Sequence, residues 1–259
     1  MKVSLVNYTG NAKELLILSK NTRHLDQIDA DNPLKEILEM DEKKKAIELE
    51  YVLNTVGSAL EFVDYTFLIK GVTRAFTHQL VRHRVGTSFA QQSLRLEKTG
   101  NFEYRADGNA VNSTHYAATM ANIRDEYTTM IRDENVDPQD ARGILPTNIL
   151  TNILFKANLR SISDIISNRL CIRTQKEFRE AAKKMADLII QIHPWAKKLF
   201  DVICIKTFNC PWKNFHDCPM KSTYNNVLSV FRDQDGIKRM MRKDFDRFSE
   251  NNFQPEVKK

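Results

Sequence analysis

The chain has 259 residues, with 39 Lys and Arg against 33 Asp and Glu, a formal net charge of +6, 42% hydrophobic residues and 28% charged residues. This composition is typical of globular domains and excludes a disordered or fibrous chain. No apolar run reaches the roughly 18 residues of a membrane span, and the opening MKVSLVNYTG lacks the apolar core of a signal peptide. Four cysteines are too few for a disulfide scaffold, so we expect a cytoplasmic protein.

The first predicted elements mix strands with helices. Alternation of apolar and polar residues predicts a strand over 2–8, and helical spacing follows over 12–25 and, at greatest length, over 33–60. The charged run DEKKKAIELE inside the last of these is either a solvated face or a break between two helices. Alternating β-branched and aromatic residues then predict a strand over 62–69.

Gly71 is expected to end that strand, and Thr73 to cap a helix through about residue 84. The polar segment 85–96 predicts a loop leading into a short strand. In chain order, the remaining predicted elements are helices over 112–132 and 138–142, a strand over 147–155, and helices over 158–169 and 174–192. The pattern predicts one α+β domain over 1–195 and a C-terminal extension of unknown role over 196–259.

Glycine spacing excludes two common nucleotide-binding motifs. The eight glycines are too far apart to form GxGxxG or GxxxxGK[ST], so the chain has neither a Rossmann fingerprint nor a Walker P-loop. Side chains would therefore have to hold the phosphates of a nucleotide. The positive net charge suits nucleotides, folates or nucleic acid without choosing among them.

One segment concentrates groups that bind phosphate. The run RHRVGTSFAQQSLR over 82–95 holds three arginines, one histidine, two glutamines and three hydroxyl side chains. Guanidinium groups bind phosphate oxygens in pairs, and serine hydroxyls add donors. Taken by itself, RHR is also compatible with the solvated basic end of a helix.

The segment resembles the signature of the flavin-dependent thymidylate synthases, which is RHR, seven residues, then Ser-x-Arg. Here RHR lies at 82–84 and Ser-Leu-Arg at 93–95, with eight residues between them. In chain order, the other blocks similar to the family are LEFVDYTF over 60–67, RAFTHQLV over 74–81, RGILP over 142–146, NLRS over 158–161, and Arg169 followed by TQKEFR over 174–179. Several blocks in the same order and with nearly matching spacing, over about residues 50–190, make this resemblance specific.

The resemblance implies an α+β fold with an antiparallel sheet flanked by helices. It implies transfer of a one-carbon unit from methylenetetrahydrofolate to C5 of dUMP, with FAD as hydride carrier and NADPH as reductant of the flavin. It also implies a homotetramer whose sites are shared between subunits, with no membrane or nucleic-acid partner.

The resemblance also implies roles for individual residues. The implied FAD-binding residues are Arg82, His83, Arg84, Gln91, Asn158, Leu159, Arg160 and Asp164. The implied dUMP-binding residues are Gln79, Arg82, Gln91, Gln92, Ser93, Leu94, Arg95, Arg142 from a neighbouring subunit, and Arg169. Arg169 is the implied catalytic residue, because a fixed positive charge beside the uracil favours ionisation at N3 and makes C5 nucleophilic.

The chain departs from the family pattern where the flavin and folate would lie. Phe62 replaces a His, and a phenyl ring cannot donate a hydrogen bond. Asp64 and Asp164 replace neutral residues near FAD, whose pyrophosphate would repel them unless a cation neutralises them. Either Gln91 or Gln92 replaces an acidic residue. These departures favour a second hypothesis beside thymidylate synthesis, namely a hydroxymethylase that gives 5-hydroxymethyl-dUMP or acts on dCMP.

Two patterns outside these blocks carry weaker signals. Four potential zinc ligands, Cys204, Cys210, His216 and Cys218, are spaced C-x5-C-x5-H-x-C, which is not a standard zinc motif. Free or buried thiols in a C-terminal loop are the alternative, and we expect no metal. The basic run KRMMRK over 238–243 is either a solvated helix face or a nucleic-acid contact, which leaves a nucleic-acid-binding protein as a third hypothesis.

Overall fold

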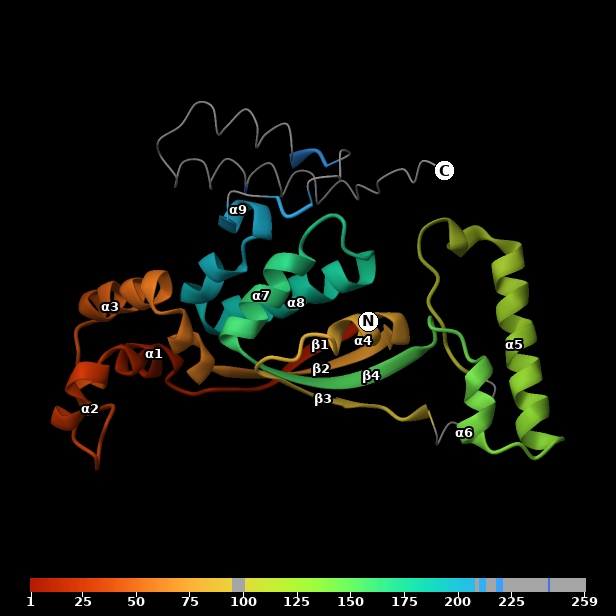
Figure 1. Ribbon diagram of the computed structural model, residues 1–259, viewed down its shortest axis with the longest axis horizontal. Coiled ribbons are helices and arrows are strands. Elements are labelled where there is room, and N and C mark those ends of the chain that lie inside the picture. Colours follow the sequence, from red (N-terminus) through yellow and green to blue (C-terminus); the bar gives the residue numbers. More distant parts are fainter. Residues whose placement is uncertain (95–100, 208–209, 213–217, 221–241, 243–259) are drawn as a thin grey trace. The chain divides into compact units, whose positions relative to one another are not determined.

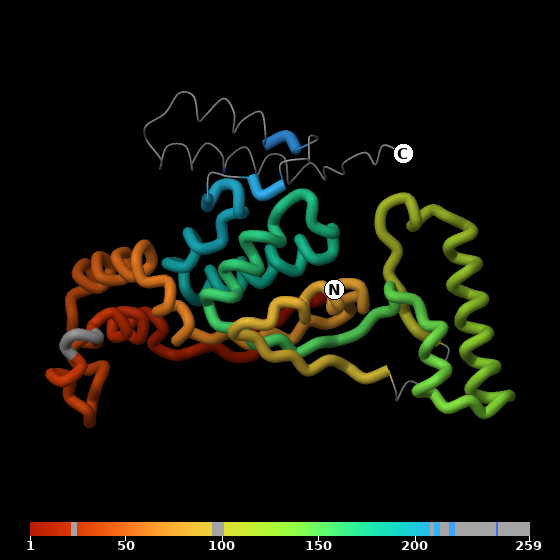
Figure 2. Tube along the Cα trace, in the orientation of Figure 1, coloured from red at the N-terminus to blue at the C-terminus, as the bar shows by residue number. Residues whose placement is uncertain are grey.

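The computed structural model describes residues 1–94, 101–207, 210–212, 218–220 and 242, apart from the side chains of 22–24 (Figures 1 and 2). The chain divides into two compact units, Met1–Ser161 and Ile162–Lys259. Within the described part of the chain, no helix has both the length and the apolar character needed to cross a membrane.

A four-stranded antiparallel sheet forms the centre of the first unit (Figure 1). In chain order, its strands are β1 (Lys2–Tyr8), β2 (Asp64–Thr73), β3 (Thr87–Gln91) and β4 (Leu150–Asn158). Their order in the sheet is β1-β2-β4-β3, so the two longest strands pair at the centre. The antiparallel α+β fold expected from the motifs is therefore confirmed.

One face of this sheet is buried. Tyr65 and Phe67 of β2 and Ile153 and Phe155 of β4 are completely shielded from solvent, whereas Leu154 on the other face is 40% exposed. The two-residue period of a strand sends alternate side chains to opposite faces, which explains this division. Burying each large apolar side chain contributes about 1.5–3 kcal/mol to stability.

The helices before β2 are shorter than the sequence predicts. In chain order, they are α1 (Ala12–Lys20), a 3-10 helix (Thr22–Gln27), α2 (Lys35–Leu38), α3 (Glu42–Thr55) and a 3-10 helix (Gly57–Phe62). The predicted 33–60 helix is divided before Glu42, because the Asp41 carboxylate accepts hydrogen bonds from the Lys43 and Lys44 amides at 3.0 and 3.3 Å. The charged run therefore marks a helix N-terminus, and the division into two helices is confirmed.

Strand β2 continues past Gly71, so the prediction that this glycine ends the strand is wrong. Gly71 adopts a φ of 65°, the register with β4 shifts there, and its amide donates to the Asn152 Oδ1 atom at 3.1 Å. A glycine with a positive φ can form a β-bulge within a strand as well as a turn that ends the strand. Thr73 caps α4 (Arg74–Leu80) as expected, accepting a hydrogen bond from the Phe76 amide at 3.0 Å. The helix ends before the RHR segment.

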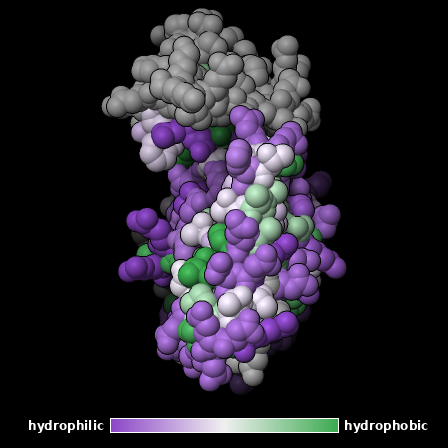
Figure 3. Space-filling view, turned by 90° about the vertical axis from the view of Figure 1, so that its right-hand side faces the viewer, coloured by the Kyte–Doolittle hydropathy of each residue, from purple (hydrophilic) through white to green (hydrophobic). Residues whose placement is uncertain are grey.

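The remainder of the first unit is an arm made of a 3-10 helix (Gly108–Asn112), α5 (Thr114–Arg132), α6 (Pro138–Ala141) and a 3-10 helix (Arg142–Ile144). Only Met120 and Tyr127 of α5 are buried. Figure 3 views the side of the molecule that carries α5, where hydrophilic residues cover most of the face and hydrophobic ones lie between them. Strand β4 begins later than predicted, because the Ile149 amide closes a turn onto the Pro146 carbonyl at 3.2 Å.

The second unit is helical. Helix α7 (Leu159–Arg169) leads into it, and α8 (Lys176–Ile192), a 3-10 helix (Pro194–Phe200) and α9 (Ile203–Thr207) follow. Apolar residues buried along α8 recur every three or four positions, at Phe178, Ala181, Ala182, Met185 and Ile189. The two predicted helices over 158–169 and 174–192 are confirmed. The predicted domain boundary after residue 195 stays a prediction, since the compact units divide after Ser161.

Candidate functional site

The loop over residues 82–86, called the RHR loop below, lies against the first turn of α7, although the two are far apart in the sequence. The Asn158 amide donates to the Gly86 carbonyl at 3.0 Å, and the Ser161 hydroxyl donates to the Val85 carbonyl at 2.6 Å. The Asn158 Oδ1 atom in turn accepts from the Ser161 amide at 2.9 Å, which caps α7. Two of the predicted FAD-binding blocks are thus brought together.

Gly86 makes this close approach possible. Its φ is 63°, a left-handed conformation that glycine adopts without steric cost. A Cβ atom at this position would overlap the side-chain amide of Asn158 and lie 2.8 Å from the Ser161 Oγ atom. The sequence therefore needs glycine here for the loop to reach the helix.

The RHR segment presents two cations to solvent. The His83 amide donates to the Leu80 carbonyl at 3.1 Å, and the Thr87 hydroxyl donates to the His83 carbonyl at 2.5 Å. These bonds fix the backbone on both sides of the histidine. Arg82 and Arg84 are exposed, and neither forms an ion pair with an acidic residue among those that the structure describes. Both guanidinium groups are available to an anion.

The glutamines near RHR point to different elements. Gln91 donates from Nε2 to the Thr77 hydroxyl of α4 at 3.0 Å, and α4 also carries the half-buried Gln79. Gln92 instead accepts at Oε1 from the Asn152 Nδ2 atom of β4 at 2.6 Å. Adjacent glutamines with the same side chain thus have different surroundings.

Other predicted nucleotide-binding residues lie near the ends of β3 and α6. Ser93 is exposed and Leu94 is half-buried, while Arg95 lies outside the described residues. Arg142 is half-buried at the start of a 3-10 helix. Burial, and secondly the nearby charge of Arg142, lower the pKa of Arg74. Sequence reasoning gave Arg74 no role, although it opens the RAFTHQLV block and could have been noticed there.

The two unexpected carboxylates near the predicted flavin site each have a cation beside them. Asp64 lies 2.7 Å from the Lys156 ammonium on the neighbouring strand, and Asp164 lies 3.8 Å from the Lys206 ammonium. Lys206 also donates to the Ser163 hydroxyl at 2.9 Å. Such exposed pairs add little stability, roughly 0–1 kcal/mol each. They do neutralise the negative charge that would otherwise repel a pyrophosphate.

Phe62 lies where the chain enters β2 and is 60% exposed. Its neighbour Glu61 accepts a hydrogen bond from the Arg160 Nη1 atom at 2.6 Å, and the Leu159 amide donates to the Val63 carbonyl at 2.7 Å. The first turn of α7 therefore fixes the segment that presents the Phe62 ring. An exposed ring on a fixed backbone can stack on a planar ligand.

Arg169 ends α7 in the second unit. Its guanidinium carbon lies 4.5 Å from the ring centroid of the buried Phe178. A guanidinium over an aromatic face is attracted by the ring and restricted in orientation. Asn158 and Arg169 mark the two ends of one helix, and a rise of 1.5 Å per residue separates them by about 16 Å.

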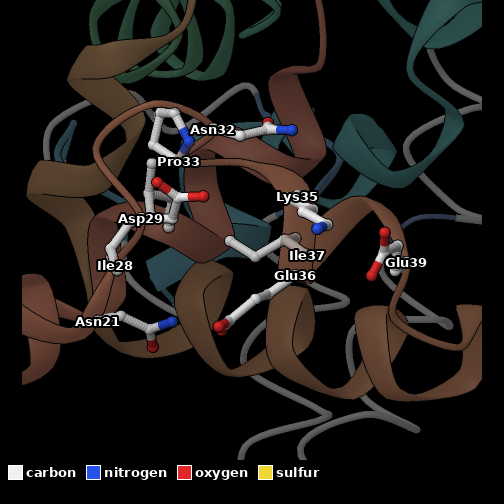
Figure 4. A pocket seen from close by; sticks show the side chains of 10 residues that line it. Asn21, Ile28, Asp29, Asn32, Pro33, Lys35, Glu36, Ile37 and Glu39 are labelled. Carbon is white, nitrogen blue, oxygen red and sulfur yellow. The ribbon is translucent and has the colours of Figure 1, made fainter.

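A cavity of about 320 Å³ near the N-terminus contains none of the predicted site residues. Figure 4 shows its largely polar side chains. The lining residues are Leu18, Asn21, Ile28, Asp29, Asn32, Pro33, Lys35, Glu36, Ile37 and Glu39. The predicted site residues are identified by sequence motifs and not by this cavity.

Comparison with known proteins places the chain in a family. The family model described as thymidylate synthase complementing protein matches residues 4–195. A flavin-dependent thymidylate synthase of Sulfurisphaera tokodaii is 33% identical over 201 residues, covering 75% of each chain. Another protein of that name, from Pyrococcus furiosus, is 32% identical over 226 residues, covering 82% of this chain and 89% of the relative.

Solved structures share the fold. The flavin-dependent thymidylate synthase ThyX of Helicobacter pylori, complexed with FAD and dUMP, superposes with a TM-score of 0.58 at 22% identity, covering 77% of this chain and 98% of that one. The UMP/dUMP methylase PolB of Streptomyces cacaoi, bound with 5-Br dUMP, gives a TM-score of 0.60 at 19% identity, covering 77% and 94%. By its family match and its relatives, this chain belongs to the flavin-dependent thymidylate synthase family.

Proposed function

We propose that this protein transfers a one-carbon unit from methylenetetrahydrofolate to C5 of dUMP and yields dTMP, with FAD as cofactor and NADPH as reductant. The docking of the RHR loop onto the first turn of α7 carries this proposal, through the 3.0 Å hydrogen bond from the Asn158 amide to the Gly86 carbonyl. Family membership supports the same activity.

The residues at this docked loop fit a flavin dinucleotide. The proposed FAD-binding residues are Arg82, His83, Arg84, Gln91, Asn158, Leu159, Arg160 and Asp164. The exposed guanidiniums of Arg82 and Arg84 suit a pyrophosphate, and the N-terminus of α7 adds a positive helix end beside them. The Lys156 and Lys206 ammonium groups offset Asp64 and Asp164. When bound, the flavin supplies hydride transfer, and the protein binds and orients it.

In this proposal, dUMP binds next to the flavin. The proposed dUMP-binding residues are Gln79, Arg82, Gln91, Gln92, Ser93, Leu94, Arg95, Arg169 and, from a neighbouring subunit of a homotetramer, Arg142. The hydrogen bond from Gln91 to Thr77 of α4 supports Gln91 as the residue in the place of the family's carboxylate, because α4 also carries Gln79. Gln92 is engaged by β4 instead.

Arg169 is the proposed catalytic residue. Its guanidinium keeps its charge near neutral pH, so beside the uracil it favours loss of the N3 proton and raises electron density at C5. The Phe178 ring 4.5 Å away supports this role, since it restricts the orientation of the guanidinium. As the bond between C5 and the transferred carbon forms, the bond from that carbon to one folate nitrogen breaks. Loss of the C5 proton and cleavage of the bond to the second folate nitrogen then release tetrahydrofolate and leave an exocyclic methylene on C5, which one hydride converts to the methyl group.

A second product is favoured by one observation. Phe62, 60% exposed in the place of a histidine, alters the surface that would contact the folate and flavin rings. Water, rather than hydride, would then trap the exocyclic methylene on C5 and give 5-hydroxymethyl-dUMP. This second reaction consumes no hydride.

The demand for hydride separates the two reactions. Purified protein is loaded with FAD, reduced anaerobically, and mixed with dUMP and methylenetetrahydrofolate while the absorbance of oxidised flavin is recorded. Thymidylate synthesis predicts one flavin oxidised for each nucleotide converted, and only when both substrates are present. Conversion of nucleotide without flavin oxidation would establish the hydroxymethylase instead, and dCMP in a parallel sample tests the cytosine alternative. A protein that binds flavin but converts neither nucleotide refutes the proposed function.

A further inference from the structure

Thr77 is a threonine of α4 to which the proposed function gives no role. Its side chain is fully buried. A hydroxyl group carries one proton to donate and lone pairs that accept. Both capacities are engaged here, because the Thr77 Oγ1 atom lies 3.0 Å from the Arg74 carbonyl oxygen and 3.0 Å from the Gln91 Nε2 atom.

The direction of these two hydrogen bonds follows from the chemistry of the partners. A carbonyl oxygen can only accept, so the single hydroxyl proton of Thr77 is donated to the Arg74 carbonyl. The Thr77 oxygen can then only accept from Gln91, which turns its amide nitrogen toward the threonine. The other end of that carboxamide, the Gln91 Oε1 atom, accepts no hydrogen bond from the described residues.

The backbone that carries Gln91 is fixed by β4. Gln91 is the last residue of β3 and pairs with Ile153. The following amide, that of Gln92, donates to the Asn152 carbonyl at 2.9 Å, and the Gln92 side chain accepts from the Asn152 Nδ2 atom at 2.6 Å. Only the side-chain torsions of Gln91 remain to be set, and the hydrogen bond to Thr77 sets them.

We propose that Thr77 is a positioning residue, which holds the Gln91 carboxamide with its oxygen toward the nucleotide. This inference rests on the proposed function, in which Gln91 binds dUMP. A carboxamide has a donor end and an acceptor end, and a free one presents either. With its nitrogen held by Thr77, Gln91 offers an acceptor alone. It therefore selects a hydrogen-bond donor of the nucleotide, which is the uracil N3–H or the 3′-hydroxyl of the deoxyribose.

The reversed orientation of the carboxamide is disfavoured before any ligand binds. It would place the Gln91 oxygen against the Thr77 oxygen, which has no second proton to donate. A hydrogen bond would then be lost at a fully buried hydroxyl. The acceptor is thus in place in the free protein, and nucleotide binding does not have to order it.

Binding of dUMP to FAD-loaded protein, measured by isothermal titration, tests the proposal. Thr77→Val keeps nearly the same shape but cannot accept from Gln91, so the Kd for dUMP should rise roughly threefold to tenfold, the effect of one neutral hydrogen bond. Thr77→Ser restores the hydroxyl and should restore the Kd. The matched control is Thr151→Val, because Thr151 is buried in β4 and its hydroxyl has no hydrogen-bond partner among the described residues. Its Kd should stay at the wild-type value.

A double substitution separates orientation from mere structural support. In Gln91→Glu both ends of the side chain are acceptor oxygens, so Thr77 has no orientation left to choose. Adding Thr77→Val to this variant should change the Kd by less than about twofold. The proposal is overturned if the loss persists with glutamate, or if Thr77→Val alone binds dUMP as tightly as the wild type. A wild type that binds no dUMP refutes the proposed function and this inference with it.

Two analogues identify the nucleotide group that Gln91 contacts. One is the 2′,3′-dideoxy nucleotide, which lacks the 3′-hydroxyl, and the other is 3-methyl-dUMP, which lacks the N3–H. The ratio of the Thr77→Val Kd to the wild-type Kd should fall to about one for the analogue that lacks the contacted donor. A ratio that stays raised for both analogues overturns the proposal.

A spectroscopic measurement needs neither nucleotide nor a Thr77 variant. The Gln91 Nε2 protons of the wild type should exchange with water more slowly than those of the exposed Gln92, whose engaged atom is Oε1. Their nuclear magnetic resonance signals are assigned by their loss in Gln91→Glu and Gln92→Glu. Equal exchange rates overturn the proposal even where Thr77→Val fails to fold.

Discussion

Replacing Gly86 with alanine is expected to undo the docking of the RHR loop on α7. The new Cβ atom would overlap the Asn158 amide and lie 2.8 Å from the Ser161 Oγ atom, at a φ of 63°. A left-handed alanine costs roughly 1–2 kcal/mol, and a lost helix cap and a lost hydrogen bond cost about 1 kcal/mol each. These three costs together should lower the free energy of unfolding by about 3 kcal/mol and Tm by roughly 6–12 °C.

The same substitution should weaken flavin binding. A loop displaced from α7 withdraws a guanidinium from its phosphate, and a charge-assisted hydrogen bond is worth about 1.5–3 kcal/mol. The Kd for FAD should therefore rise roughly tenfold to a hundredfold. Isothermal titration with FAD and thermal denaturation measure the two effects.

Gly57→Ala is the matched control for this prediction. Gly57 has open space where a Cβ would lie and is not among the glycines with positive φ. We expect its Tm and its Kd for FAD to stay close to those of the wild type. The reasoning is refuted if Gly86→Ala behaves like Gly57→Ala in both measurements.

Three further predictions concern catalysis, capping and charge. Arg169→Ala should lower kcat by roughly a hundredfold or more while Tm and FAD binding persist; wild-type turnover would contradict the assigned role. Thr73→Ala should cost about 1 kcal/mol in the free energy of unfolding by removing the cap of α4, whereas Thr73→Ser should not; equal Tm values would contradict this. Lys156→Ala leaves Asp64 uncompensated and should weaken FAD binding more at low salt than at high salt; a salt-independent Kd would count against that charge balance.

Periodicity predicted most of the elements because the local pattern and the tertiary contacts agree. The first strand has the predicted bounds, and three helices start and end within two residues of the predicted positions. The errors occur where a distant residue decides the outcome. Asn152 holds the Gly71 amide in a bulge, and nothing in the sequence near Gly71 indicates that partner.

The site was predictable only in part. Motifs identified the residues of the RHR and NLRS blocks, but their contact at Gly86 depends on the pairing of β3 with β4, which spacing does not reveal. The roles of individual residues stay predictions. The basic run over 238–243, with the nucleic-acid hypothesis that rests on it, lies largely outside the described residues.

The cysteines show the same limit of sequence reasoning. A search for zinc ligands by spacing selected neighbours in the chain, including His216, which lies outside the described residues. The fold instead packs Cys171, from before α8, against the same small apolar cluster as Cys204 and Cys218, from after it. Sequence distance hides such a partner, because a whole helix separates the two stretches.

The central claim is tested most directly by the mass of the nucleotide product. The protein is incubated anaerobically with dUMP, methylenetetrahydrofolate, FAD and NADPH, and the nucleotides are separated and weighed by mass spectrometry. Our account predicts dTMP, formed only when all four are present and formed roughly a hundredfold or more slowly by Arg169→Ala. A hydroxymethylated nucleotide, or unchanged dUMP with an active flavoprotein, would contradict it.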